Sequence, residues 1–387
     1  MPHTVIDPAQ ALEERIQEQR LRKLTSVVPV NAIELLCEGK RYLNFTSNDY
    51  LGLSQHPFLK QRAAEFISRY GVGSGASRLL SGNNEIYDSI ENRLAALKGS
   101  QSALVFSSGY QLNFTVLSAL ASIGGAFLCD RLVHNSLLTG AMASKAVFHR
   151  FRHNDLSDLK RALAESQEKD SRGWIVTESV FGMDGDIADL AGYADLSKNT
   201  GFKLFVDEAH ATGIFGEAGM GLANANSDGQ LVMGTFGKAC GSFGAYIACS
   251  LQMRDYLVNF CPGFIYTTAL PPPVLGAIEA ALQIIPTMTK EREHILSLAK
   301  HTRSSLRSLG FDVGASASQI IPIIVGTDER ALSLSQHLMR NQIFAPAVRP
   351  PTVPPKSARL RLAISALHRE EHIERLLAAC KQWQQLQ

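Results

Sequence analysis

The sequence predicts an α/β protein whose core is a mostly parallel β-sheet wrapped by helices. Between residues 103 and 250, short apolar runs alternate with stretches suited to helices, and several runs are bounded by Gly, Ser or Asp. Strands of a parallel sheet are buried on both faces, so they read as continuous apolar runs rather than as alternating ones. The expected strands cover residues 103–106, 126–129, 174–176, 204–206, 231–232 and 245–248.

A smaller α+β unit is expected at the C-terminus. A long helical pattern follows three consecutive prolines and covers residues 274–300, with a break near Pro286. Two strand-like runs and a terminal helix come after it, at residues 319–325, 359–364 and 370–387.

The N-terminal residues form a lead-in segment. Residues 7–22 have the pattern of an amphipathic, charged helix, and a polar stretch then leads to a short strand-like run at 42–45. We therefore expect three parts: an N-terminal helix and lead-in segment over 1–48, a large domain over 49–285 and a small α+β domain over 286–387.

The composition favours a folded cytoplasmic protein over several other classes. The 387 residues are 45% hydrophobic and 19% charged, which is too apolar for a disordered chain. Lys and Arg number 38 against 36 Asp and Glu, and their even spread offers no basic surface to a nucleic acid. The six cysteines form no C-x-x-C pair. The first residues lack the apolar run of a signal peptide and are too acidic for a transit peptide, so a reducing cytoplasm is expected.

One stretch is long enough to cross a bilayer, because residues 99–129 contain no charged side chain. Polar residues such as Gln101, Ser107, Gln111 and Asn113 interrupt it. We interpret the stretch as a strand, a turn and a buried helix, and we expect no membrane partner.

The ends of the predicted strands carry the residues best suited to chemistry, since ligands of such sheets bind at the carboxyl ends of the strands. Asp207 and His210 follow the run at 204–206, and Lys238 follows the run at 231–232 among small residues. Taken alone, the Asp–His pair is as readily a helix cap beside a surface histidine as a functional site. The lysine favours the functional interpretation, because the glycines around it would let a flat ligand approach the backbone.

Lys238 and Asp207 together indicate pyridoxal 5′-phosphate as a cofactor. A lysine amine forms a Schiff base with the cofactor's aldehyde once it has lost its proton. A buried carboxylate beside the pyridine nitrogen keeps that nitrogen protonated, which the cofactor needs in order to accept electrons. We expect His210 to form a hydrogen bond nearby.

The cofactor's phosphate needs an anion site, and the segment 107–110 is the candidate. It ends an expected strand and opens a helix, so backbone N–H groups and the positive end of the helix dipole meet there. A plain turn of small residues explains the segment equally well when it is considered alone. The hydroxyl of Thr235 is suited to the same phosphate, and the ring of His134 is suited to stacking on the cofactor.

One pattern points to a different chemistry. Residues 368–372 match H-x-x-E-H, which in some zinc peptidases supplies two histidines from one helix. Those enzymes take a further carboxylate ligand from farther along the chain, and only 15 residues remain after His372. We therefore interpret the pattern as the polar first turn of the terminal helix and expect no metal site.

Several segments resemble the α-oxoamine synthase family, pyridoxal-phosphate enzymes of fold type I, over nearly the whole chain. The resemblance implies a mostly parallel seven-stranded sheet wrapped by helices, a smaller α+β C-terminal domain and an N-terminal lead-in segment. The family as a whole is indicated by residues 177–181, 207–210 and 234–238. One member, which joins L-alanine to a pimeloyl thioester, is indicated by residues 47–53, 75–82, 266–272 and 349–354.

The resemblance also implies roles for individual residues. Lys238, Asp207 and His134 would be catalytic, and Arg349 would receive the amino-acid carboxylate through bidentate hydrogen bonds. The implied cofactor-binding residues are Gly109, Tyr110, His134, Glu178, Asp207, His210, Thr235 and Lys238, with Thr267 or Thr268 supplied by a neighbouring subunit. The implied substrate-binding residues are Arg22, Asn48, His134, Arg349 and Thr352.

The implied reaction is the decarboxylative condensation of L-alanine with a pimeloyl thioester, a step of biotin biosynthesis, in a homodimer with shared active sites. The acyl group is carried by coenzyme A or by an acyl-carrier protein, and the sequence leaves that choice open. A sibling that uses glycine or serine, such as a glycine C-acetyltransferase, is one alternative. A pyridoxal-binding protein without activity is another, although it would be expected to lack Lys238 or Asp207.

The chain departs from the family pattern at one position. Family members often carry serine where this chain has Gly182. A cofactor contact through that hydroxyl is therefore absent or replaced.

Overall fold

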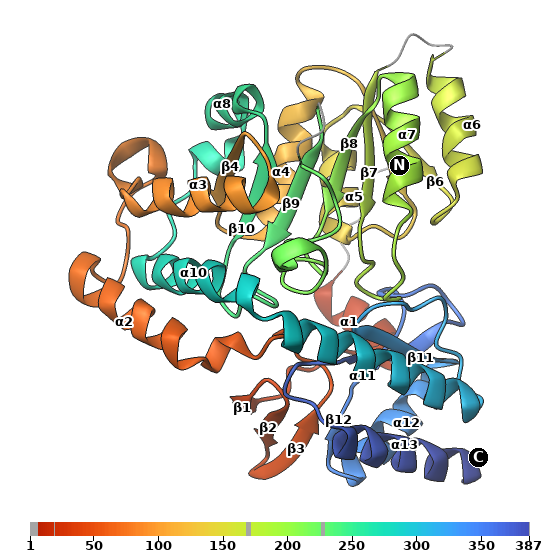
Figure 1. The fold of residues 1–387 in the computed structure, drawn as a ribbon. Helices are drawn as coiled ribbons and strands as arrows, with labels where there is room; N and C mark the ends of the chain where they lie inside the picture. Colours follow the sequence, from red (N-terminus) through yellow and green to blue (C-terminus); the bar gives the residue numbers. More distant parts are fainter. Residues whose placement is uncertain (1–6, 19, 168–171, 226–228, 387) are drawn as a thin grey trace.

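A seven-stranded β-sheet lies at the centre of the computed structural model, which describes residues 7–18, 20–167, 172–225 and 229–386 (Figure 1). The strand order is β4–β10–β9–β8–β7–β5–β6; β10 is antiparallel to both neighbours and the other pairs are parallel. The mostly parallel seven-stranded sheet is thus confirmed. The strands are β4 (Ser102–Phe106), β5 (Ala126–Asp130), β6 (Val147–Phe151), β7 (Gly173–Glu178), β8 (Lys203–Asp207), β9 (Leu231–Thr235) and β10 (Ala245–Cys249).

Burial explains why one strand of this sheet was missed in the sequence. Every residue of β7, β9 and β10 is buried, so each of them reads as an apolar run. Strand β6 lies at the sheet edge, and only Phe151 of its residues is buried. Because His149 and Arg150 interrupt its apolar pattern, β6 was not among the strands predicted.

Helices cover the sheet and enclose two apolar cores. Within β4, Ala103 and Val105 belong to one core and Leu104 and Phe106 to the other, as the two-residue period of a strand requires. Helices α2, α3 and α10 contribute to the first core, and α4 to α8 contribute to the second. The helices of this part are α2 (Pro57–Tyr70), α3 (Ile86–Lys98), α4 (Gly109–Ala121), α5 (Asn135–Ala143), α6 (Leu156–Gln167), α7 (Leu190–Thr200), α8 (Leu251–Phe260), α9 (Pro262–Ile265) and α10 (Pro272–Ile284), with short turns at Leu53–Gln55, Arg78–Gly82 and Glu217–Gly219.

The C-terminal part has its own three-stranded sheet, in the order β11–β14–β13 with antiparallel pairs. Both strands and the terminal helix expected here are present, and the long helical pattern does break at Pro286. His368 of the H-x-x-E-H pattern lies just before the terminal helix and is buried against the ring of Phe45, so the pattern is only partly a polar first turn. The elements are a 3-10 turn at Ile285–Thr287, α11 (Thr289–Ser308), β11 (Ile320–Gly326), α12 (Asp328–Arg340), β13 (Ala347–Val348), β14 (Ala358–Ala363) and α13 (Glu370–Gln385).

The lead-in segment pairs with the C-terminal part. Its three strands form an antiparallel ribbon, and the two-residue strand β12 adds to β3 in parallel. The division into 1–48, 49–285 and 286–387 stays a prediction, and this pairing favours grouping the lead-in segment with the C-terminal domain. The strands are β1 (Val27–Asn31), β2 (Glu34–Cys37), β3 (Lys40–Asn44) and β12 (Ile343–Phe344).

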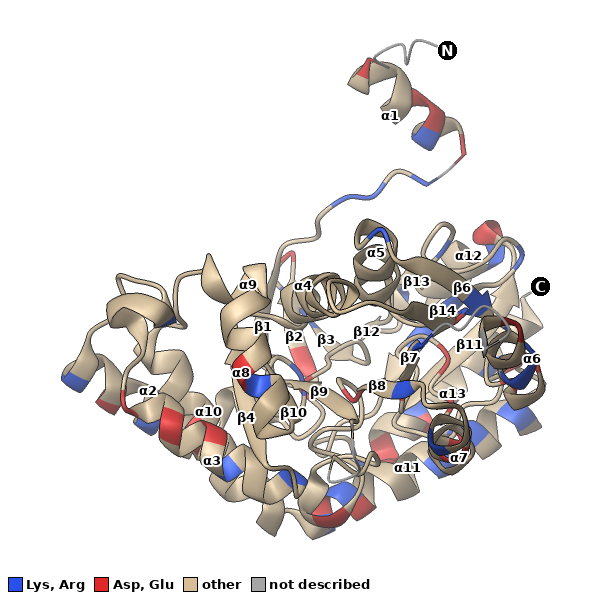
Figure 2. Cartoon of the chain, turned by 90° about the horizontal axis from the view of Figure 1, so that it is seen from above, with Lys and Arg blue, Asp and Glu red and all other residues tan. Residues whose placement is uncertain are grey.

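The first helix is shorter than predicted. Helix α1 spans Pro8–Gln17, with Asp7 accepting the N–H of Ala9 as its N-cap, whereas the sequence pattern predicted a helix up to residue 22. Figure 2 shows α1 away from the body of the protein, at the end of an extended segment that carries basic residues. None of its residues is buried, so no tertiary packing extends the helix.

The uncharged stretch 99–129 folds as β4, α4 and β5, as predicted. Within the part of the chain that the structure describes, no helix is long and apolar enough to span a bilayer. The six cysteines are free and buried.

Candidate active site

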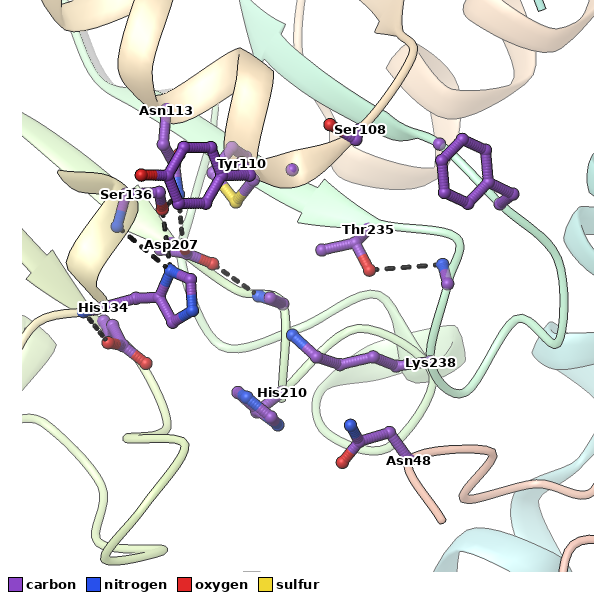
Figure 3. Close-up of a pocket in the computed structure, with 17 residues that line it drawn as sticks. Asn48, Ser108, Tyr110, Asn113, His134, Ser136, Asp207, His210, Thr235 and Lys238 are labelled. Carbon is purple, nitrogen blue, oxygen red and sulfur yellow. Dashed lines mark hydrogen bonds between the residues drawn. The ribbon is translucent and has the colours of Figure 1, made fainter. Parts of the chain in front are cut away.

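A cavity of about 230 Å³ lies at the carboxyl ends of β8 and β9, beside the N-terminus of α4 (Figure 3). This is the edge at which the sequence predicted a site, because parallel strands end there together. The predicted site residues that line it are Asn48, Gly109, Tyr110, His134, Glu178, Asp207, His210, Thr235 and Lys238.

Asp207 ends β8 with its carboxylate buried beside the cavity. The amide of Asn113 donates to Oδ2 at 2.8 Å, and the backbone N–H of Ala209 donates to Oδ1 at 2.8 Å. Asn113 lies on α4 and also donates to the hydroxyl of Ser136 at 3.0 Å. Both carboxylate oxygens are therefore oriented by fixed donors, and neither Asn113 nor Ser136 had been identified from the sequence.

The neighbouring Glu208 points into a different environment. It forms a buried ion pair with Lys98, and its other oxygen accepts the N–H groups of Leu222 and Ala223 at 2.6 and 2.8 Å. Successive residues at a strand end face opposite sides. Of the two consecutive acids, only Asp207 lines the cavity.

Lys238 follows β9, and Figure 3 shows its side chain extending across the cavity toward the side that holds Asp207 and His210. Burial lowers the pKa of the Lys238 amine to about 8, although the carboxylates of Asp207 and Glu178 partly oppose the shift. A substantial part of the amine is thus neutral near physiological pH. A neutral lysine amine is a nucleophile that can form a Schiff base.

The imidazole of His210 is held by Tyr50, a residue that sequence reasoning missed. The Tyr50 hydroxyl lies 2.7 Å from His210 Nδ1 and 3.1 Å from Asn48 Oδ1, and it accepts from Arg361 at 3.3 Å. Burial, followed by the charge of Lys238, places the pKa of His210 well below its ordinary value. The ring is therefore neutral at physiological pH. The signal for Tyr50 was its place in the segment 47–53, one of those that indicate a particular member of the family.

His134 lies in the turn between β5 and α5 and is fixed at its backbone and its ring. Its N–H donates to Glu178 Oε1 at 2.6 Å, and its Nδ1 lies 2.8 Å from the hydroxyl of Ser136. Burial lowers the pKa of His134, and it raises that of Glu178 well above the ordinary value. The sequence had identified His134 and Glu178 but not the Ser136 that orients the ring.

The N-terminus of α4 opens toward the cavity through Gly109 and Tyr110. Helix geometry leaves the first N–H groups without intrahelical partners, and the helix dipole adds positive potential there. Ser108 caps the helix by accepting the N–H of Gln111 at 3.2 Å. A Cβ on Gly109 would lie 3.2 Å from Cγ2 of Thr235, which is a tight contact. Glycine at this position therefore leaves the space between the start of α4 and Thr235 free. This end of the cavity is suited to a phosphate.

The donor set fits pyridoxal 5′-phosphate. The amine of Lys238 suits its aldehyde, the buried carboxylate of Asp207 suits its ring nitrogen, and the N-terminus of α4 suits its phosphate. These three groups line one cavity, which is the arrangement that the cofactor requires.

The other predicted residues lie outside this cavity. Arg22 donates to the hydroxyl of Thr352 at 2.8 Å, and both residues are exposed. Arg349 is half-buried just after β13. Thr267 and Thr268 line a smaller cavity together with Arg78. The roles of these five predicted residues stay predictions.

The absence of a side chain at position 182 is explained by the closeness of His210. A Cβ at position 182 would lie 2.5 Å from His210 Nε2, so a side chain there is incompatible with the present position of the ring. Arg361 also donates to the Gly182 carbonyl oxygen, which fixes the backbone at this point. The backbone of residue 182 therefore lies next to the ring of His210.

The chain belongs to the family described as aminotransferase class I and II, whose model matches residues 40–379. It is 48% identical over 373 residues to a putative 8-amino-7-oxononanoate synthase from Desulfosudis oleivorans, with 96% of this chain and 97% of the relative covered. It is 47% identical over 376 residues to the 8-amino-7-oxononanoate synthase from Gluconacetobacter diazotrophicus, with 95% and 94% covered.

A solved structure supports the same fold. A serine palmitoyltransferase from S. paucimobilis with a bound PLP–myriocin aldimine superposes with a TM-score of 0.91 at 26% identity, and 98% of this chain and 96% of that chain are covered. The fold type I class predicted from the sequence is therefore confirmed.

The pKa of Lys238 predicts how the cofactor-free chain reacts with pyridoxal phosphate. Because only the neutral amine attacks the aldehyde, the rate of reconstitution should rise with pH and reach half of its maximum near pH 8. Stopped-flow absorbance from pH 6 to 11 measures this rate, with the exposed Lys160→Ala variant as the control. A midpoint near the ordinary lysine value of about 10.4 would contradict the buried position of the amine.

Removing the Tyr50 hydroxyl should weaken cofactor binding through His210. Loss of a buried hydrogen-bond partner costs about 1–3 kcal/mol, so Tyr50→Phe should raise the Kd for pyridoxal phosphate about fivefold or more. Equilibrium titration by absorbance measures the change. Tyr256→Phe is a matched control, because the Tyr256 hydroxyl donates to Ala119 O at 2.7 Å and does not line the cavity. Equal effects of the two substitutions would refute a role for Tyr50 in the site.

Proposed function

We propose that the chain is a pyridoxal 5′-phosphate-dependent acyltransferase that condenses L-alanine with a pimeloyl thioester. The products are 8-amino-7-oxononanoate, carbon dioxide and a free thiol, as in biotin biosynthesis. The observation that carries the proposal is similarity over nearly the full length to relatives named for this product, at 47–48% identity over 95–96% of the chain. The cavity supports it with an amine of low pKa, a buried carboxylate and a helix N-terminus.

Lys238 has two tasks in this reaction. When bound, pyridoxal phosphate supplies an electron sink that stabilises negative charge on the Cα of the amino acid. Lys238 would hold the cofactor through its amine and, when the amine is free, would accept the proton from Cα of the amino acid. A pKa of about 8 allows the same amine to be a nucleophile and a proton acceptor near neutral pH.

We assign the control of charge to Asp207 and the two histidines. The carboxylate of Asp207, oriented by Asn113, favours a proton on the pyridine nitrogen. His210, which lines the cavity, would hydrogen-bond the ring oxygen of the cofactor, and His134 would contact its ring. Because both imidazoles have lowered pKa values, they remain neutral and add no charge that would compete with the pyridinium.

The remaining contacts bind the phosphate and the substrates. We assign the phosphate to the backbone N–H groups of Gly109 and Tyr110 and the hydroxyl of Thr235. Arg349 binds the alanine carboxylate by two parallel hydrogen bonds, and Arg22, Asn48 and Thr352 complete the substrate site. The Cα–acyl bond would form as the C–S bond of the thioester breaks, and the departing thiolate would take up a proton. Loss of the alanine carboxylate as carbon dioxide would then leave an electron pair on Cα, which would be protonated by the Lys238 ammonium.

A second copy of the chain is part of this proposal. Large apolar side chains are exposed on the segments around the smaller cavity that Thr267 and Thr268 line. Val72 is 74% exposed, Leu80 is 80% exposed and Tyr266 is 85% exposed. Their segments lie together, because Ser77 and Thr268 form a β-bridge. Exposed apolar patches of this kind are typical of protein interfaces. A homodimer would bury them and bring Thr267 or Thr268 of one copy to the phosphate of the other, in a cytoplasm that keeps the free thiols reduced.

The proposed activity is tested by a substrate comparison. Purified enzyme with pyridoxal phosphate should release carbon dioxide and form 8-amino-7-oxononanoate from L-alanine and a pimeloyl thioester, offered as the coenzyme A or the carrier-protein form. Lys238→Ala should abolish product and the visible absorbance band, whereas the exposed Lys160→Ala should change neither. Product is identified by mass spectrometry.

Preference for glycine or serine over alanine would replace the proposal by a sibling activity. A methyl group in the pocket changes the preference by only about 1–3 kcal/mol, so the three amino acids must be compared by kcat/KM. Turnover by Lys238→Ala would refute the mechanism.

A further inference from the structure

Two loops at the carboxyl edge of the sheet carry the surroundings of both site histidines. The loop at residues 130–134 begins at Asp130, the last residue of β5, and ends at His134. The loop at residues 179–187 follows β7 and brings the backbone of Gly182 against Nε2 of His210. Any shift of one loop relative to the other would therefore change the relative positions of the His134 and His210 rings.

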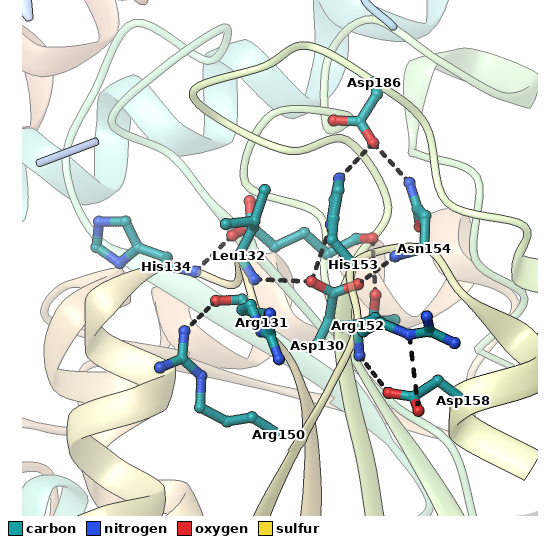
Figure 4. A network of polar contacts seen from close by, with 12 residues as sticks. Asp130, Arg131, Leu132, His134, Arg150, Arg152, His153, Asn154, Asp158 and Asp186 are labelled. Atoms are coloured by element: carbon teal, nitrogen blue, oxygen red, sulfur yellow. Dashed lines mark hydrogen bonds and ion pairs between the residues drawn. The ribbon is translucent and has the colours of Figure 1, made fainter. Parts of the chain in front are cut away.

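A third histidine bridges these loops from outside the cavity (Figure 4). His153, which follows β6, places Nδ1 2.9 Å from Asp130 Oδ1 and Nε2 2.9 Å from Asp186 Oδ2. The next residue repeats the bridge, since the N–H of Asn154 donates to Asp130 Oδ2 at 2.8 Å and its side-chain amide donates to Asp186 Oδ2 at 2.5 Å. Both carboxylates are buried.

Each carboxylate belongs to one of the two loops. Asp130 begins the first loop and also accepts the N–H of Leu132 at 2.8 Å, which shapes the turn toward His134. Asp186 lies on the second loop, where its carbonyl oxygen accepts the N–H of Phe181 at 3.0 Å. The His153 ring packs edge-on against the Phe181 ring, with the centroids 4.4 Å apart. The His153 imidazole therefore contacts the second loop twice. It hydrogen-bonds the carboxylate of Asp186 and packs against the ring of Phe181.

Glu178 forms a second connection closer to the cavity. Its two carboxylate oxygens accept the N–H groups of His134 at 2.6 Å and Gly182 at 3.3 Å. The loops are thus joined at two levels, by Glu178 beside the cavity and by His153 behind it. The second loop also binds the C-terminal domain, through Asp184 to Arg359 and through the Gly185 carbonyl oxygen.

We propose that His153 is a positioning residue of the active site, which holds the loops 130–134 and 179–187 at a fixed spacing by bridging Asp130 and Asp186 as a cation. This bridge keeps His134 and the Gly182–His210 contact in place for the cofactor. Its effect on catalysis rests on the proposed function.

The electrostatics agree with a cationic bridge. Burial alone would lower the pKa of His153, but hydrogen bonds and charges from Asp130 and Asp186 outweigh it and raise the pKa to about 10. The ring is then protonated at physiological pH, and both of its nitrogens are donors. A neutral imidazole has only one N–H, so it would leave one carboxylate without this hydrogen bond.

The test compares His153→Leu and His153→Gln with the unmodified full-length chain. Amide hydrogen exchange is followed in the cofactor-free and cofactor-loaded forms, and the Kd for pyridoxal phosphate is measured by titration. In His153→Leu we expect exchange to become about tenfold faster in both loops, and the Kd to rise about tenfold, because small displacements of positioning groups have effects of this order or larger. His153→Gln retains hydrogen bonding, so its exchange rates and its Kd should lie between those of His153→Leu and those of the unmodified chain.

Arg62→Gln is the matched control. Arg62 also bridges two carboxylates, those of Glu65 and Glu279, but it connects α2 and α10 away from the cavity. This variant should leave exchange in the two loops and the cofactor Kd unchanged, even where its melting temperature falls by as much as that of the His153 variants.

Three results would overturn the proposal. The first is faster exchange near residues 152–155 alone, and the second is a uniform increase along the whole chain in which the two loops change no more than the rest. The third is failure of both His153 variants to fold, which would make His153 a general stability element. Exchange and cofactor Kd do not depend on which amino acid is condensed. If the enzyme proved to use another amino acid, the proposed substrates would be wrong, but the proposed role of His153 would not be affected.

Discussion

The desolvated amine of Lys238 is the constraint on which the site depends. A lysine in water is charged at neutral pH and is a poor nucleophile. Burial in the cavity lowers the pKa to about 8, and the carboxylates of Asp207 and Glu178 limit that shift, so the amine can be either charged or neutral in the working range. The sheet provides this balance, because β8 and β9 are parallel neighbours and deliver Asp207 and Lys238 to the same edge.

The residues around this pair act mainly by fixing orientation. Asn113 and the N–H of Ala209 hold the Asp207 carboxylate, Ser136 holds the ring of His134, and Tyr50 holds the ring of His210. The contacts of Asp207 and His210 are buried hydrogen bonds and that of His134 is partly buried, so each group has a defined position before any ligand arrives. Such preorganisation is what a site needs if charge is to be stabilised as it develops.

Sequence reasoning found the groups that follow buried parallel strands and missed those that arrive from elsewhere. Asp207 comes directly after an apolar run and Lys238 lies a short distance beyond another, so the strand pattern located them. Tyr50 is 160 residues away from its partner His210, and no periodicity links two such positions. The same limit applied to the fold. The edge strand β6 lacks an apolar run, and the two-residue strand β12 that joins the lead-in segment to the C-terminal part is too short to produce a pattern.

The protonation state of the cofactor's ring nitrogen tests this account most directly. Enzyme loaded with pyridoxal phosphate labelled with nitrogen-15 in the ring can be examined by NMR at neutral pH. The account predicts the chemical shift of a protonated pyridine nitrogen in the unmodified protein and that of a neutral one in Asp207→Asn. A neutral nitrogen in the unmodified protein, or a protonated one that persists in Asp207→Asn, would contradict it.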